Sequence, residues 1–77
     1  MKTKKTVLKS IMPILLLEFH NFDNEIKSET TFKELKSDKL INRELLSQIE
    51  EFYQIKFPEN LILTKVDDIL KYLIRVL

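Results

Sequence analysis

The apolar positions in residues 7–19 recur at helical spacing, which predicts an amphipathic helix. The positions on one face are Leu8, Ile11, Leu15 and Phe19, and those beside them are Val7 and Ile14. Pro13 lies inside this pattern, where it would remove one hydrogen bond and clash with the preceding turn. The sequence allows two alternative helices around Pro13. Either Ser10 caps a short helix with Pro13 in its first turn, or a longer helix from about Thr3 is kinked at Pro13.

The next stretch, residues 20–31, is rich in Asn, Asp, Ser and Thr. Such side chains favour local hydrogen bonds over a continued helix, so the pattern predicts a long loop. Phe22, Ile26, Phe32 and Leu35 are expected to hold this loop against the rest of the protein.

A second helix is predicted from about Asp38 to Tyr53, with Asp38 as its N-cap. A capping carboxylate accepts from the unpaired amides and complements the positive helix end. The buried stripe is expected to contain Ile41, Leu45, Ile49 and Tyr53, widened by Leu46 and Phe52. The residues expected to face water are Arg43, Glu44, Ser47, Glu50 and Glu51. A short β-like run, Ile55–Pro58, follows the helix.

The last helix is predicted to begin at a cap formed by Thr64, because Thr64-Lys65-Val66-Asp67 is close to a capping box. Its buried stripe is expected to contain Val66, Ile69, Leu70, Leu73 and Leu77. Asp67 is placed to pair with Lys71 one turn further on.

The composition favours a single all-α domain that covers residues 1–77. Glycine is absent, which disfavours tight turns with positive φ and phosphate-cradling loops. Cysteine is absent too, which excludes disulfides and thiolate metal sites.

The net charge of +1 argues weakly against a nucleic-acid binder, because phosphate binding needs clustered positive charge. The N-terminus does cluster Lys2, Lys4, Lys5 and Lys9 ahead of the apolar run 11–17, which imitates a secretory signal. However, Lys9 interrupts the apolar stretch, no small-residue cleavage site follows, and the run is too short to span a membrane. We expect a core helix in a cytoplasmic protein, with a disordered basic tip rather than a membrane-surface or nucleic-acid module.

Candidates for catalytic or metal chemistry are few. His20 lies near Glu18 and Asp23, but one histidine with two carboxylates is a weak pattern, so a solvated loop is expected. A nucleophilic lysine needs burial or a cationic neighbour, whereas Lys39 follows the anionic Asp38. We therefore expect no catalytic residue, no metal and no enzyme activity.

The most specific pattern is FKELKSDKLINRELLSQIEEFYQIKFP, residues 32–58. Its order of phenylalanine-x-x-leucine-x-x-aspartate-x-leucine before a helix resembles the acyl carrier protein family. The resemblance implies a four-helix bundle: three main helices, a short third helix within residues 58–63, and a long loop after the first helix. Family members begin the first helix near the N-terminus, which favours the longer helix kinked at Pro13.

In the acyl carrier family, a serine between this aspartate and leucine receives the phosphopantetheine arm. Here Asp38 and Leu40 are present, but Lys39 stands between them. An ammonium group offers no oxygen nucleophile, so no cofactor is expected. The alternative is a working acyl or peptidyl carrier that attaches 4′-phosphopantetheine at the displaced Ser37.

The resemblance also implies a docking surface on the second helix. Lys36 stands where the family usually has glycine, and Arg43 and Ser47 stand where it usually has aliphatic residues. The expected partner-binding residues are Asp38, Lys39, Leu40, Arg43, Glu44, Ser47, Glu50 and Glu51. Family members are usually strongly acidic and meet basic patches on their partners, so the charge of +1 is a departure.

The leading hypothesis is a non-loadable docking, scaffold or regulatory partner of fatty-acid, polyketide or peptide-synthetase-type enzymes. The competing interpretation is that Arg43 and Ser47 are ordinary solvated positions.

Overall fold

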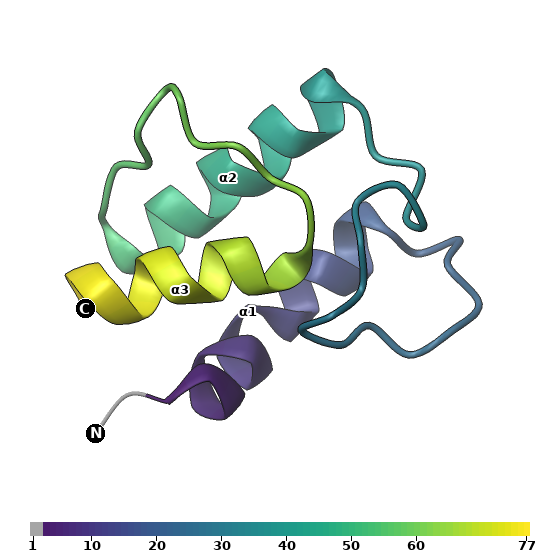
Figure 1. Ribbon diagram of the computed structural model, residues 1–77, viewed down its shortest axis with the longest axis horizontal. Helices are drawn as coiled ribbons and strands as arrows, with labels where there is room; N and C mark the ends of the chain where they lie inside the picture. Colours follow the sequence, from purple (N-terminus) through teal and green to yellow (C-terminus); the bar gives the residue numbers. More distant parts are fainter. Residues whose placement is uncertain (1–2) are drawn as a thin grey trace.

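The computed structural model describes residues 3–77, which form three α-helices (Figure 1). They are α1 (Lys4–Glu18), α2 (Lys39–Tyr53) and α3 (Val66–Val76). Within the described residues the only β-type pairing is an isolated antiparallel bridge between Thr31 and Lys65. The prediction of an all-helical fold is confirmed.

The segment between α2 and α3 differs from expectation. Residues 58–63 contain no helix; they form a turn in which the Leu61 amide donates to the Pro58 carbonyl at 3.2 Å, followed by irregular chain. The β-like run at Ile55–Pro58 is irregular and joins no strand. Both predictions were wrong, because the backbone hydrogen bonds of these segments are isolated: a single turn closes at Leu61, and the amides of Ile55 and Phe57 bond to Glu50 rather than to a strand.

Helix α1 begins at Lys4 with Thr3 as its N-cap. Thr3 Oγ1 accepts from the Thr6 amide at 3.2 Å, and Thr6 Oγ1 accepts from the Thr3 amide at 3.1 Å. One helix runs through Pro13, so the longer helix is confirmed. Ser10 is not a cap; its hydroxyl donates to the Val7 carbonyl at 2.8 Å, inside the helix.

The expected disordered basic tip is also wrong for the described residues. Lys4, Lys5 and Lys9 lie on α1, where the cap at Thr3 starts the helix before the first of them. Lys2 lies outside the described residues.

The core lies where α1 packs against both α2 and α3. Its helical members are Val7, Ile11, Leu15, Leu45, Ile49, Val66, Ile69, Leu70 and Leu73. Leu8, Ile14, Ile41, Leu46 and Tyr53 pack at its edge. Two predicted members are exposed instead: Phe52 at 58% and Leu77 at 38%. Phe52 lies at the margin of the α2 stripe, where its ring meets Tyr53 edge-on at 4.9 Å.

The long loop between α1 and α2 is held in place as the sequence predicts. Ile26, Phe32 and Leu35 are buried, and Phe22 is half-buried. Three backbone hydrogen bonds also tie the loop to the start of α3 (Figure 1). They run from Phe32 N to Thr64 O at 3.0 Å, from Val66 N to Thr30 O at 2.9 Å and from Asp67 N to Ser28 O at 2.8 Å.

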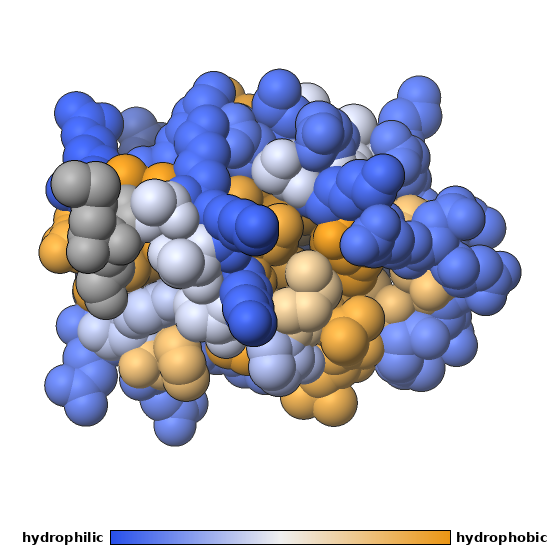
Figure 2. Space-filling model, turned by 90° about the horizontal axis from the view of Figure 1, so that it is seen from below, coloured by the Kyte–Doolittle hydropathy of each residue, from blue (hydrophilic) through white to orange (hydrophobic). Residues whose placement is uncertain are grey.

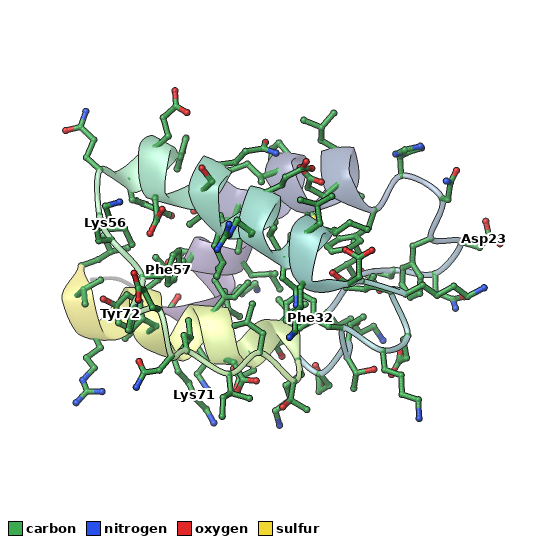
Figure 3. All side chains as sticks on the ribbon, turned by 90° about the horizontal axis from the view of Figure 1, so that it is seen from above. Asp23, Phe32, Lys56, Phe57, Lys71 and Tyr72 are labelled. Atoms are coloured by element: carbon green, nitrogen blue, oxygen red, sulfur yellow. The ribbon has the colours of Figure 1, made fainter. Side chains whose placement is uncertain are left out.

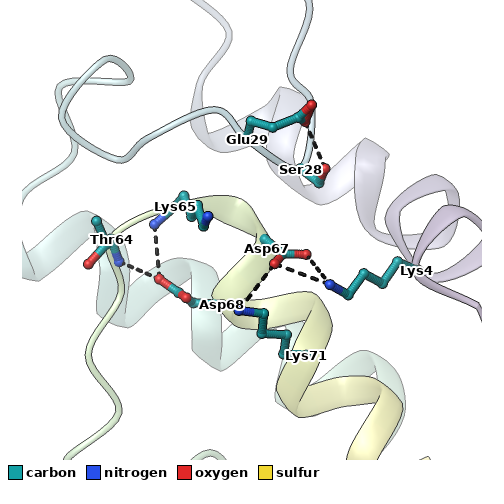
Figure 4. Close-up of polar contacts among 8 residues, drawn as sticks. All are labelled: Lys4, Ser28, Glu29, Thr64, Lys65, Asp67, Asp68 and Lys71. Atoms are coloured by element: carbon teal, nitrogen blue, oxygen red, sulfur yellow. Dashed lines mark hydrogen bonds and ion pairs between the residues drawn. The ribbon is translucent and has the colours of Figure 1, made fainter.

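Helix α3 begins one residue later than predicted, with Lys65 rather than Thr64 at the N-cap. The Asp68 carboxylate accepts from the Thr64 amide at 2.7 Å and from the Lys65 amide at 3.0 Å (Figure 4). The capping carboxylate is therefore Asp68. Asp67 is turned toward two cations: it pairs with Lys71, as predicted, at 3.5 Å, and with Lys4 of α1 at 2.9 Å.

Asp67 is expected to stabilise the fold in a pH-dependent way. The hydrogen bond from Lys4 lowers the pKa of Asp67 below its ordinary value of 3.8, and the charges of Lys4 and Lys71 act in the same direction. Asp67→Asn should therefore lower the free energy of unfolding near pH 7 by about 0.5–1 kcal/mol, because the lysines are half exposed.

A depressed pKa stabilises the folded state above the unfolded pKa, and this contribution disappears as pH falls through the folded pKa. The difference between the natural chain and Asp67→Asn should thus be constant from pH 7 to 5, begin to shrink near the ordinary pKa of 3.8 and disappear only as the pH falls through the lower pKa of the folded state. Urea titrations at a series of pH values measure it, with Asp23→Asn on the exposed loop as the control. An equal difference at pH 3 and pH 7 would contradict the assignment.

Some apolar groups reach the surface, and on the face seen from below they form patches between hydrophilic side chains (Figure 2). The large exposed apolar side chains of the described residues are Leu16, Leu17, Leu40, Phe52, Ile62, Val76 and Leu77. None of the three helices combines the length and the apolar character needed to cross a membrane.

Candidate functional site

The candidate site lies at the N-terminus of α2, which is positioned by a tight turn over residues 31–37. The turn is closed by Leu35 N to Thr31 O at 3.2 Å, Lys36 N to Lys33 O at 3.1 Å and Ser37 N to Phe32 O at 3.0 Å. Buried Phe32 and Leu35 anchor it to the core. Lys36 adopts a left-handed conformation with φ of 57°, which is unfavourable by about 1 kcal/mol or more for a residue with a Cβ atom.

Asp38 caps α2 as predicted. Its backbone is extended, and Oδ1 accepts from the Ile41 amide at 2.9 Å. Lys39 is then the first residue of the helix, and its side chain is exposed. The following Leu40 is 66% exposed. The turn and the cap together present Lys39 and Leu40 to solvent at the positive end of the helix.

Ser37 is engaged within the turn rather than presented to solvent. It is half-buried, and its hydroxyl donates to the Asn42 side-chain oxygen one turn into α2. This hydrogen bond ties the turn to the first part of the helix.

A groove of about 910 Å³ lies between α2 and residues 56–63. The α2 wall contains Lys39, Asn42, Arg43, Leu46, Ser47 and Glu50, and the other wall contains Lys56, Phe57, Pro58, Glu59, Leu61 and Leu63. Four of the predicted partner-binding residues therefore line one groove: Lys39, Arg43, Ser47 and Glu50.

The other predicted partner-binding residues are placed differently. Leu40, Glu44 and Glu51 are exposed but do not line the groove, so they form the outer face of α2. Asp38 is the helix cap. The eight residues predicted from one sequence pattern thus separate into a groove side, an outer side and a cap.

Glu50 contributes to structure as well as to the groove. It is half-buried, and its Oε2 accepts from the Phe57 amide at 2.7 Å. The Phe57 ring is buried and lies 5.0 Å from the ring of Tyr72, and the Tyr72 hydroxyl donates to the Lys56 carbonyl at 2.8 Å (Figure 3). These contacts hold the second wall of the groove against α2 and α3.

Sequence reasoning missed this second wall. Phe57 was assigned to a β-like run, and Lys56, Leu61 and Leu63 were not connected with α2. The one local signal is the apolar and aromatic character of Phe57, Leu61 and Leu63 in a segment without helical spacing. Such residues must pack on a neighbouring element.

The cations of the groove have no ionic partner among residues 3–77. The ion pairs in this part of the chain involve Lys4, Lys27 and Lys71. Lys39 and Arg43, by contrast, lie one helical turn apart, and no carboxylate of the described residues lies within 4.0 Å of either. Like charges at this spacing destabilise a helix by about 0.2–0.5 kcal/mol, and cations are disfavoured at the positive helix end.

The histidine cluster considered from the sequence does not assemble. His20 is exposed, with Nδ1 3.3 Å from the Leu17 carbonyl oxygen, while the Glu18 carboxylate accepts from the Gln48 side-chain amide. Among residues 3–77, no three His, Cys, Asp or Glu side chains are grouped to hold a metal ion.

A second carboxylate with a lowered pKa lies outside the groove. A hydrogen bond from the Ser28 hydroxyl at 2.8 Å lowers the pKa of Glu29, which is exposed on the loop near the start of α3 (Figure 4). An exposed carboxylate in such a contact is a solvated surface group.

Comparisons of the chain with protein-family models, with curated proteins and with solved structures find no match.

Proposed function

We propose that this chain is an acyl carrier protein-like domain that does not carry a phosphopantetheine arm and acts by docking on acyl- or peptide-assembly enzymes. The observation that carries the proposal is the position of Lys39. It is exposed at the first residue of α2, directly after the capping Asp38, where the family resemblance puts the attachment serine.

The backbone around Lys39 supports the proposed equivalence. Lys36 has a φ of 57°, a conformation that glycine adopts without cost, and the resemblance puts a glycine at this position. The long loop before α2 and the anchoring by Phe32 and Leu35 also agree with the carrier arrangement. The short helix that the resemblance implies within residues 58–63 is replaced by a turn and irregular chain.

The residues at this position do not fit the phosphopantetheine group. The arm is held through a phosphoester to a hydroxyl oxygen, and Lys39 has an ammonium group instead. Ser37, the nearest hydroxyl before the cap, is half-buried and donates to Asn42. We therefore propose no chemistry through the arm, and the remaining role is recognition by a protein partner.

Docking should depend on the charge at the start of α2. Tagged natural chain should capture a fatty-acid, polyketide or peptide-synthetase-type enzyme from the lysate of its own source, identified by mass spectrometry. Arg43→Glu should lower the captured amount at least severalfold, because Arg43 is exposed, lines the groove and has no ionic partner among residues 3–77.

The matched control for this capture experiment is Lys9→Glu, the same change of charge at an exposed position of α1. It should capture the enzyme as the natural chain does. Recovery of no acyl- or peptide-assembly enzyme, together with identical behaviour of Arg43→Glu, would refute the proposed function.

A further inference from the structure

We infer that the groove between α2 and residues 56–63 binds an acidic, apolar segment of the partner protein. This inference rests on the proposed docking function and specifies the chemistry of its partner. Its charge pairing is opposite to the one that the family resemblance implies, in which an acidic carrier meets a basic patch.

The lining of the groove is partly apolar, which favours a partner segment with apolar side chains. Leu46 contributes from α2, and Phe57, Leu61 and Leu63 contribute from the opposite wall. That wall is already held by the Phe57 amide bonded to Glu50 and by the Phe57 ring against Tyr72. A groove whose walls are fixed before binding loses little conformational freedom when a partner enters it.

The cations of the groove favour an acidic segment, because they have no ionic partner among residues 3–77. Lys39 and Arg43 lie one turn apart at the positive end of α2, and no carboxylate among residues 3–77 lies within 4.0 Å of either. Each disfavours the other, and the helix dipole disfavours Lys39, which lies in the first turn. A partner carboxylate placed between them would relieve both repulsions, and Lys56 adds a third positive charge from the opposite wall.

The acidic residues of the lining do not cancel this preference. Three cations, Lys39, Arg43 and Lys56, line the groove with two carboxylates, Glu50 and Glu59, so the lining keeps an excess of positive charge; the Glu50 carboxylate accepts from the Phe57 amide, and Glu59 is exposed. The other acids of the helix, Glu44 and Glu51, are exposed on the outer face. Both cations of α2 therefore face the groove near its N-terminus, while Glu50 is the one α2 carboxylate in the lining and lies almost two turns beyond Arg43; this arrangement sets the orientation of an acidic segment.

The test is a titration of the isotopically labelled full chain, followed by NMR of its backbone amides. Three synthetic amphipathic peptides serve as probes; they share the same leucine positions and differ only in carrying Glu, Lys or Gln at the polar positions. The Glu peptide should shift amides of Lys39, Arg43, Leu46 and the residues of 56–63 other than Pro58, which has no backbone N–H. Its dissociation constant should rise roughly tenfold in Lys39→Glu/Arg43→Glu, because two attractive charges become repulsive.

The matched control is Lys5→Glu/Lys9→Glu, two exposed cations at the same spacing on α1, which should bind the Glu peptide like the natural chain. Equal binding of the Lys peptide, shifts outside the groove, or no binding of the Glu peptide would each overturn the inference. Decanoate is a fourth probe. If it shifts the groove amides and the Glu peptide does not, the groove is a site for a small amphipathic anion, and the inference is wrong.

The peptide titration and the capture experiment can fail independently of each other. Groove binding of the Glu peptide without capture of an acyl- or peptide-assembly enzyme would refute the proposed function alone. Capture of such an enzyme that is unchanged in Lys39→Glu/Arg43→Glu would refute the groove inference alone.

Discussion

Replacing Lys39 by serine is expected to convert the chain into a substrate for a permissive phosphopantetheinyl transferase. After incubation with coenzyme A, the intact mass of Lys39→Ser should rise by one phosphopantetheine arm, while that of the natural chain stays unchanged. The physical reason is the geometry of the site. Position 39 is the exposed first residue of α2, where helix amides and the helix dipole stabilise a phosphate, and Asp38 keeps the cap in place.

Two control variants make this experiment decisive. Arg43→Ser introduces the same hydroxyl one turn further along α2, on an equally exposed position, and should gain no mass. Lys39→Ser/Ser37→Ala should still be loaded, because Ser37 is bonded to Asn42 and is not the proposed attachment point. An unchanged mass of folded Lys39→Ser would refute the equivalence of position 39 with the attachment serine. An arm on the natural chain that is lost in Ser37→Ala would favour a working carrier.

Leu45→Ala is expected to remove a large part of the stability of the fold. Leu45 is fully buried where α2 faces the core, so its truncation leaves a cavity and should lower the free energy of unfolding by about 2–5 kcal/mol. A chain of 77 residues has about 4–11 kcal/mol in total. Urea unfolding followed by circular dichroism measures the change, and the midpoint of thermal unfolding should fall by about 8 °C or more.

The same helix offers a matched control for the core substitution. Leu40→Ala makes the identical chemical change at a side chain that is 66% exposed, and it should change the free energy of unfolding by less than about 0.5 kcal/mol. Equal effects of the two substitutions would contradict the packing of α2 described here.

The first and last residues of α2 are an example of what the sequence could predict. The predicted helix from about Asp38 to Tyr53 matches the observed Lys39–Tyr53, because both the capping carboxylate and the four-residue apolar period act within the helix itself. The start of α3 shows the opposite case. Asp67 and Asp68 are both suitable acids; the structure places Asp68 at the third position of the helix, where it caps, and pairs Asp67 with Lys4, which lies 63 residues away.

In the candidate site, too, the local features could be predicted from the sequence and the long-range contact could not. The sequence placed Lys39 beside a capping aspartate, and the structure agrees. It treated Glu50 as a solvated docking residue, whereas the fold brings Phe57 to its carboxylate. No local pattern indicates that contact, since it depends on how the irregular segment after α2 folds back.

The sequence by itself determined the helical class, the three helices and the exposed lysine after the Asp38 cap, because caps and apolar periods are interactions between residues at most four positions apart. Only the tertiary structure decided that residues 58–63 form no helix and that residues 56–63 close a groove beside Lys39 and Arg43. It also brought Lys56 of the joining segment to the same groove as Lys39 and Arg43. These features arise from contacts between α2, α3 and the segment that joins them, and such contacts exist only once the chain has packed.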